Sequence, residues 1–142
     1  MIKTDHLCKI MSAQAELMDA IMESLTGAQQ ALVESNGEVL EYWMRREEEL
    51  LRPFRDLEQD RLHCVEEIAG CPKSVQQLIP DVPEEERSVL QALSNRMRAS
   101  ASRIMEINLQ NSLLLRNALR FVQETLRAVT DDNRRKLVDE RM

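Results

Sequence analysis

The chain has 142 residues and a net charge of −6, and charged residues make up 31% of it against 3% for aromatic residues. This length fits one domain with a modest core, and a composition rich in Leu, Glu, Arg, Gln and Ala favours long helices over strands. Because basic and acidic residues are interleaved, we expect no nucleic-acid partner and no membrane insertion, and three cysteines without a secretion signal favour reduced thiols in the cytoplasm.

The first predicted helix covers residues 5–35. Its apolar residues recur at helical spacing and fill about 140° of the helical wheel, more than the ~100° that one neighbour requires. We therefore expect this helix to contact two neighbours. Asn36 and Gly37 follow it and are predicted to end it, because both residue types accept the left-handed conformation.

The second predicted helix covers residues 38–69, and Gly70 and Pro72 are its stop signals. Pro53 lies in the middle of this helix, where it removes one backbone hydrogen bond and clashes with the preceding turn, at a cost of about 3 kcal/mol. We predict a kink at Pro53 rather than a full break.

The segment after the second helix is rich in proline. Val75, Leu78 and Ile79 are spaced to form one helical turn, which we expect to cap the base of the bundle. A start signal for a third helix follows, because Asp81 offers a side-chain acceptor three residues before the acidic Glu84.

The third predicted helix covers residues 83–130 and keeps near-heptad apolar spacing. It is about 70 Å long, against about 45 Å for each of the other two helices. The sequence thus predicts an all-α fold, an elongated antiparallel three-helix bundle or coiled coil with a long C-terminal helix. We expect residues 1–130 to form a single helical domain and the charged residues 131–142 to form a flexible tail.

The mismatch in length leaves the end of the third helix without a neighbour from its own chain. This uncovered part is an arm of residues 109–130, and its apolar side chains include Leu115, Leu119, Phe121, Val122, Leu126 and Val129. Leu109 and Leu113 add apolar surface on a different face of the same helix. An apolar surface of this kind usually binds a partner or another copy of the chain, so we predict partner binding here.

Two asparagines, Asn108 and Asn111, lie on the apolar face of the third helix. They are interpreted as polar residues that fix the register of a coiled coil, with Glu47 as a neighbour at the same height. The alternative is that they meet polar groups of a partner.

Residues near His63 superficially suggest a metal site, because Asp60 precedes it by three residues and Cys64, Glu66 and Glu67 follow it. His63 points away from the apolar face toward solvent, and no second motif of this kind occurs. No triad, glycine-rich phosphate loop or paired-carboxylate cleft is recognisable either. We expect no metal, no cofactor and no enzymatic activity.

A set of residues distributed in order along most of the chain forms a recognisable pattern: Gly37-Glu38-Val39-Leu40, Arg46, Leu50-Leu51, Leu57, Arg61-Leu62, Ile104, Ile107, Asn108, Asn111, Leu114-Leu115 and Phe121-Val122. In this order they resemble the FlgN family of flagellar export chaperones. The most specific part is the spacing of Asn108, Asn111 and Leu114. Pro53 departs from the unbroken second helix of that family.

The resemblance implies a small cytoplasmic helical protein that binds the C-terminal helices of hook-associated proteins, which form the junction between the flagellar hook and filament. Such a chaperone keeps these clients unpolymerised and delivers them to the flagellar type III export apparatus. The client contacts that the resemblance implies are Leu114, Leu115, Ala118, Phe121, Val122 and Leu126. The alternative is a coiled-coil structural or adaptor protein that uses the same overhang to form a homodimer.

Overall fold

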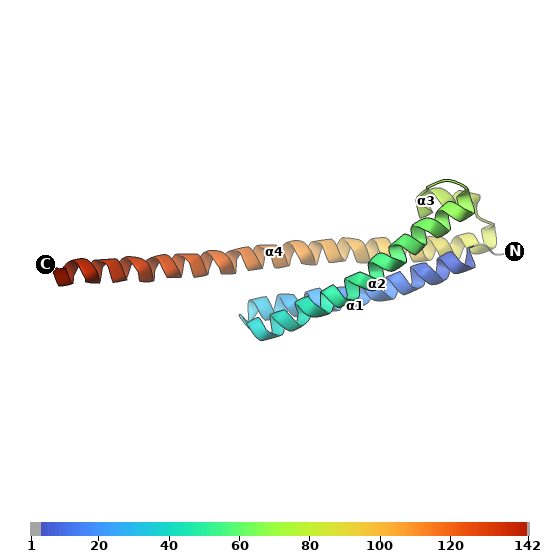
Figure 1. The fold of residues 1–142 in the computed structure, drawn as a ribbon. Coiled ribbons are helices and arrows are strands. Elements are labelled where there is room, and N and C mark those ends of the chain that lie inside the picture. Colours follow the sequence, from blue (N-terminus) through green and yellow to red (C-terminus); the bar gives the residue numbers. More distant parts are fainter. Residues whose placement is uncertain (1–3, 142) are drawn as a thin grey trace.

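The computed structural model describes residues 4–141, with residues 132, 133 and 139–141 described by their backbone alone. The elements in chain order are α1 (Asp5–Val33), α2 (Gly37–Ala69), α3 (Val75–Leu78), the 3-10 helix η1 (Ile79–Asp81) and α4 (Glu84–Arg141). α1 and α2 form an antiparallel hairpin, and α4 runs back beside it and continues far past its tip (Figure 1). The predicted all-α fold with a long C-terminal helix is confirmed.

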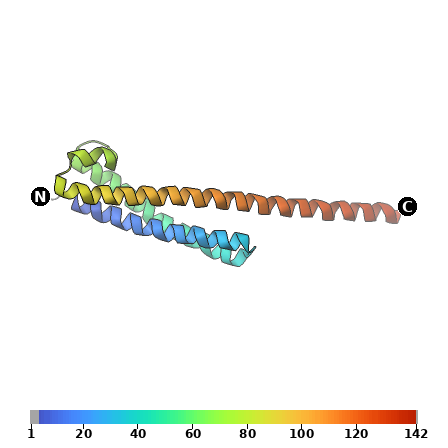
Figure 2. The same ribbon diagram turned by 180° about the vertical axis from the view of Figure 1, so that it is seen from behind.

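α1 is the central helix of this bundle. Its backbone packs closely against both α2 and α4, whereas among the described residues no Cα atom of α2 lies within 8 Å of a Cα atom of α4. Figure 2 shows α4 and α1 side by side with α2 behind them. Eleven residues of α1 are buried, against three of α2, so the wide apolar face of the first helix does serve two neighbours.

The main core lies at the base of the bundle, where α3 and η1 close the end. Leu7 of α1, Val65 of α2, Leu78 of α3 and Leu90 of α4 are buried there together. α3 confirms the predicted helical turn, and a capping box holds it: the Ser74 side chain accepts from the Gln77 backbone N–H, and the Gln77 side chain accepts from the Ser74 backbone N–H.

A second core cluster lies nearer the hairpin tip and joins Ile21 and Leu25 of α1 to Leu50 of α2 and Ile107 of α4. Two residues beyond Leu25, the indole ring of Trp43 packs directly over Gly27. A Cβ atom at Gly27 would overlap that ring. The absence of a side chain at Gly27 therefore lets α1 and α2 approach closely beside the tip.

The helix ends agree with the sequence at Gly70 and near Pro83, and differ from it at the hairpin tip. Gly70 ends α2 in the left-handed conformation, as predicted, with φ of 77°. At the hairpin tip, however, Ser35 adopts positive φ, while the Asn36 side chain accepts from the backbone N–H of Val39 and caps α2. α4 begins at Glu84, one residue after the predicted start at Pro83, and the Asp81 carboxylate in η1 pairs with Lys73.

α2 passes through Pro53 as one continuous helix, so a full break is excluded; the kink stays a prediction. α4 runs to Arg141, so the predicted helix end at Thr130 is wrong. The physical reason is that the chain after Pro83 contains neither glycine nor proline, so nothing stops the helix. The flexibility predicted for residues 131–142 stays a prediction, and residue 142 lies outside the described residues.

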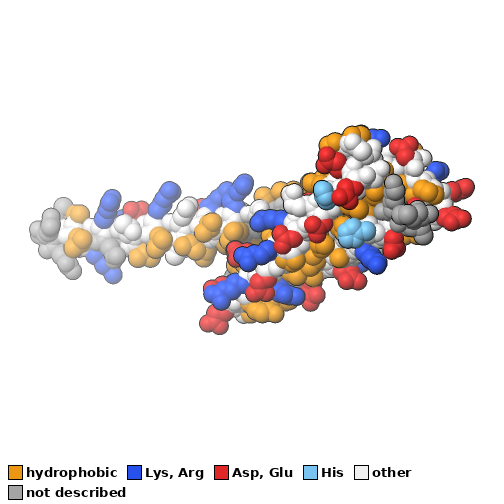
Figure 3. Space-filling view, turned by 45° about the vertical axis from the view of Figure 1, so that its right-hand side comes forward, with side chains coloured by type: hydrophobic (Ala, Val, Ile, Leu, Met, Phe, Trp, Pro, Cys, Tyr) orange, Lys and Arg blue, Asp and Glu red, His pale blue; other side chains and the backbone are white. Residues whose placement is uncertain are grey.

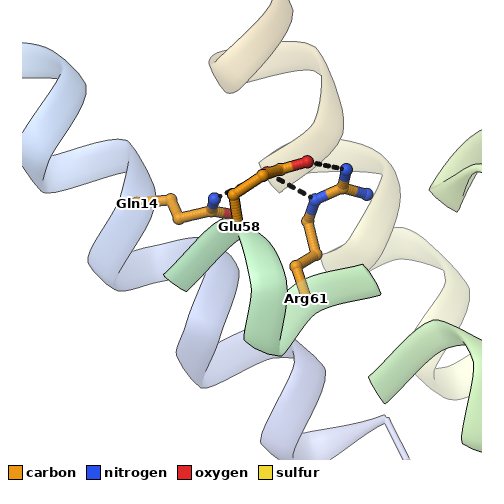
Figure 4. A network of polar contacts seen from close by, with 3 residues as sticks. All are labelled: Gln14, Glu58 and Arg61. Atoms are coloured by element: carbon orange, nitrogen blue, oxygen red, sulfur yellow. Dashed lines mark hydrogen bonds and ion pairs between the residues drawn. The ribbon is translucent and has the colours of Figure 1, made fainter. Parts of the chain in front are cut away.

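A polar network crosses the interface of α1 and α2 near the middle of the bundle (Figure 4). Gln14, which is fully buried, donates from Nε2 to Oε2 of Glu58 over 2.9 Å. Arg61 donates to both carboxylate oxygens of Glu58. Hydrogen bonds from Arg61 and Gln14 and the Arg61 charge hold the pKa of Glu58 below its usual 4.5, although desolvation opposes them.

We expect Gly27→Ala to destabilise the protein by about 1–2 kcal/mol, because the overlap with Trp43 outweighs the helix propensity that alanine gains. Thermal unfolding followed by circular dichroism measures the loss, and tryptophan emission reports displacement of the ring. Gly37→Ala is the matched control, since a Cβ atom there meets nothing within 4 Å. Equal stability of Gly27→Ala and the wild type would contradict the close packing.

The lowered pKa of Glu58 predicts a specific acid sensitivity. A carboxyl whose folded-state pKa is depressed stabilises the fold above its unfolded value, about 4.5, and loses this contribution as pH falls through the lower folded value. Glu58→Gln should therefore be less stable than wild type at neutral pH, and the two unfolding temperatures should converge as pH falls from 4.5 through the lowered folded-state pKa. Glu66→Gln, an exposed change on the same helix, should run parallel to wild type at every pH.

Candidate partner-binding surface

α4 loses its intrachain cover at Leu114, the last half-buried residue of the helix. Every residue of the arm after it, 115–130, is exposed. Figure 3 shows the arm projecting from the bundle, with hydrophobic side chains along one edge and most Lys and Arg side chains along the other. The uncovered C-terminal overhang that the helix lengths predict is therefore present.

The apolar side chains of the arm form one stripe, which we call the seam. Side chains advance by about 100° per residue, so the seam continues the face that Ile104, Ile107 and Asn111 turn toward the bundle. Six of its side chains are 43–70% exposed. The seam consists of Leu114, Leu115, Ala118, Leu119, Phe121, Val122, Leu126 and Val129.

Leu109 and Leu113 do not belong to the seam. They are 62% and 48% exposed and lie on the opposite side of α4, so a single partner helix on the seam does not reach them. Leu137, in contrast, continues the seam beyond the predicted arm and is also exposed. The sequence contains only a weak signal for Leu137. It follows Leu126 by eleven residues, about three helical turns, and polar Thr130 and Asn133 lie between them on the same side of the helix.

Between α2 and α4 lies an apolar trough whose floor is α1. It contains two adjacent hollows of about 140 and 270 Å³, both of which are lined by Glu47 and Asn108. The residues that line one or both include Met18, Leu25, Leu32, Leu40, Met44, Leu51, Phe54, Met105 and Leu115. Because Leu115 closes one end of the trough, the seam begins where the trough ends. Periodicity alone gave no sign of the trough, since it depends on the separation of α2 from α4.

Polar groups sit at the junction of trough and seam. Asn111 donates from Nδ2 to the backbone oxygen of Leu25 over 2.9 Å, which fits the predicted register-fixing role. Its Oδ1 atom is buried and has no hydrogen-bond partner among the described residues. Glu47 lines the same hollow, and desolvation, followed by repulsion from Glu48, raises its pKa above 4.5. Glu47 and the two asparagines thus line one hollow, although α2 and α4 make no close backbone contact among the described residues.

The residues around His63 lie on the outer face of α2. His63 is 74% exposed, as predicted, and its Nε2 atom lies 3.0 Å from Glu67. In the described part of the chain, no group of three or more His, Cys, Asp or Glu residues is arranged to hold a metal ion. Burial raises the pKa of the Cys8 and Cys64 thiols above 9.0, so both are protonated at neutral pH.

A protein-family model described as FlgN protein matches residues 1–137. The chain belongs to the FlgN family. This family is associated with flagellar export chaperones and is not an enzyme family. Comparison with curated proteins and with solved structures finds no match.

For this FlgN-family chain, the matched region includes the bundle, the trough and the whole seam. Residues 4–141 contain no helix with both the length and the apolar character needed to cross a bilayer. The trough and the exposed arm, both built from helices, form the candidate partner surface.

The raised pKa of Glu47 predicts that this carboxyl opposes folding at neutral pH. A carboxyl with a raised folded-state pKa supports the fold below its unfolded value, about 4.5, and loses that support as pH rises through the folded value. Glu47→Gln keeps the shape without the charge, so we expect a higher unfolding temperature at pH 7 and no difference near pH 4. Glu23→Gln, an exposed change on α1, should leave the unfolding temperature unchanged.

Proposed function

We propose that this protein is a cytoplasmic export chaperone that binds the C-terminal amphipathic helices of hook-associated flagellar proteins on the seam of α4. Binding keeps the client from polymerising and presents it to the flagellar export apparatus. The observation that carries this proposal is the exposed seam on a helix with no intrachain neighbour, in a chain of the FlgN family.

The spacing of the seam supports a helical client. Leu115, Leu119, Val122, Leu126 and Val129 follow one another at intervals of four and three residues, the repeat with which two helices interdigitate. A client helix with apolar residues at the same spacing would cover them, and its end would reach the trough at Leu115. The apolar face of the client helix would then be covered by the seam and could not contact other client molecules, which supports a role in preventing polymerisation.

The energetic gain supports reversible binding. Six seam side chains are about half exposed, and covering each would contribute about 1 kcal/mol, with a similar gain from the client. Association costs about 4–15 kcal/mol of lost freedom, so most of this gain is offset. A chaperone has to release its client for export, and a balance of this kind allows release.

We expect Val122→Asp to weaken client binding at least about tenfold, because a carboxylate would be buried without a partner at the centre of the seam. The measurement is fluorescence anisotropy of a labelled peptide from the C-terminal helix of a hook-associated protein. Gln123→Asp introduces the same charge one residue further on, outside the seam, and should bind the peptide as wild type does. Equal affinities of the two variants would remove the seam as the client site.

Truncation after Asn117 tests the arm as a whole. The truncated chain keeps both core clusters, so it should retain cooperative thermal unfolding of the bundle while losing the client peptide. Loss of cooperative unfolding would mean that the later turns of α4 belong to the core.

Self-association is the second candidate function, and the same seam favours it because two copies could cover each other's arms. Sedimentation velocity at micromolar concentration separates the two functions. A monomer that forms a one-to-one complex with the client peptide supports the chaperone; a tight dimer that does not bind the peptide supports a structural coiled-coil protein.

A further inference from the structure

The face of α4 opposite the seam carries a row of arginines. Arg116, Arg120, Arg127 and Arg134 are all exposed, and they lie within about 40° of one another on the helical wheel. Leu109 and Leu113, which the seam leaves unused, begin the same row at the same helical spacing. We call these six residues the second row. Figure 3 shows most Lys and Arg side chains of the arm along the edge away from the hydrophobic one.

The arm is basic although the chain is acidic. Residues 109–130 contain three basic residues and one acidic residue, a net charge of +2, whereas the rest of the chain contains sixteen basic and twenty-four acidic residues, a net charge of −8. In physiological salt, exposed charges further apart than the Debye length of about 8 Å are largely screened from each other, and the arm extends further than that from the bundle. Its positive charge is therefore not cancelled by the acidic body.

Some arginines of the bundle have acidic partners, whereas Arg52, Arg55, Arg87 and Arg98 form no ion pair with the described side chains. Arg45, Arg46, Arg61, Arg96 and Arg103 each form an ion pair with an acidic side chain. Arg116, Arg120 and Arg127 form none with the side chains that the structure describes. Glu124 and Asp131 do follow Arg120 and Arg127 by four residues, but a basic residue placed before an acidic one is the weaker order for such a pair.

We propose that this face of α4 is a second docking surface, for a partner helix that carries acidic side chains at seven-residue spacing. The partner's apolar residues would cover Leu109 and Leu113, and its carboxylates would pair with the arginines at coiled-coil spacing. Because the second row lies opposite the seam, this partner binds while a client occupies the seam. Simultaneous occupancy rests on the proposed function, whereas the second surface does not.

Other anionic partners fit the row less well. It is one side chain wide and begins with two leucines, which a phosphate backbone or a lipid headgroup does not require. Glu124 and Asp131 lie beside the arginines and would repel phosphates, but they can pair with basic residues that flank the seam of a partner helix. Two copies of the second row placed face to face would repel each other, because both carry arginines.

The test uses the full chain and a designed fluorescent helical peptide. On the peptide face that meets the second row, the first two positions are leucine and the following ones are glutamate, and the peptide is synthesised in both sequence directions. We expect binding that weakens with salt and that falls at least about tenfold in the double variant Arg120→Glu and Arg127→Glu. The matched control is Arg52→Glu and Arg55→Glu, the same change in charge on exposed residues of α2, which should leave binding unchanged. A peptide with lysine in place of glutamate should not bind.

Several results would overturn the second surface: no binding of the glutamate peptide by wild type, equal binding by the arm variant, or equal loss in the control. Binding of anionic vesicles or a single-stranded oligonucleotide that the arm variant loses would assign the row to phosphates instead. Self-association that the arm variant loses would assign it to a second copy.

The client peptide and Val122→Asp keep the two proposals separate. Loss of the client site with an intact response to the glutamate peptide would refute the proposed function alone. Loss of the glutamate peptide with an intact client site would refute the second surface alone. Displacement of one peptide by the other would refute simultaneous occupancy.

Discussion

The packing of α1 against both α2 and α4 determines where this molecule has a core and where it has a free surface. Because α1 is shared, its end at Val33 is also the end of the apolar cover available to α4. α4 has 58 residues against 29 in α1, and its apolar face continues without change past that point. Water tolerates such a stripe poorly, so the same periodicity that builds the core also builds the binding surface.

The central position of α1 has a second consequence. It keeps α2 and α4 apart, and side chains alone cannot fill the space between them, so a trough is left over the second core cluster. The polar groups there are imperfectly satisfied, with Glu47 partly desolvated and Asn111 Oδ1 without a partner. By contrast, the Glu58 carboxylate deeper in the bundle receives hydrogen bonds from Gln14 and Arg61. Buried side-chain oxygens of Thr4, Gln14 and Glu86, nearer the base, also lack a hydrogen-bond partner among the described residues, so unsatisfied polar groups are not confined to the trough.

The arm combines two kinds of surface on one helix. A client helix can cover the arm's apolar seam, and the removal of this apolar surface from water supplies affinity. Its arginines are suited to exposed, salt-dependent pairing, which contributes more to orientation and to the rate of encounter than to affinity. A helix without intrachain neighbours is accessible from all sides, so the two faces need not compete. This arrangement suits a protein of a chaperone family that holds one partner while it meets another.

Much of this architecture was predictable from the sequence, because helical periodicity and stop signals are local. The three long helices, the stop at Gly70, the short turn at Val75 and Leu78, and the exposed seam all followed from spacing and length. Local signals also misled where a residue had two uses: Asn36 caps α2 instead of ending α1, and the charged residues after Thr130 continue α4 because nothing in them breaks a helix. Only the tertiary structure decided that α1 lies between its neighbours, that Trp43 packs on Gly27 and that a trough separates α2 from α4. The physical reason is that an amphipathic pattern fixes which face of a helix is buried, while the choice of neighbour depends on how whole faces fit together across the chain.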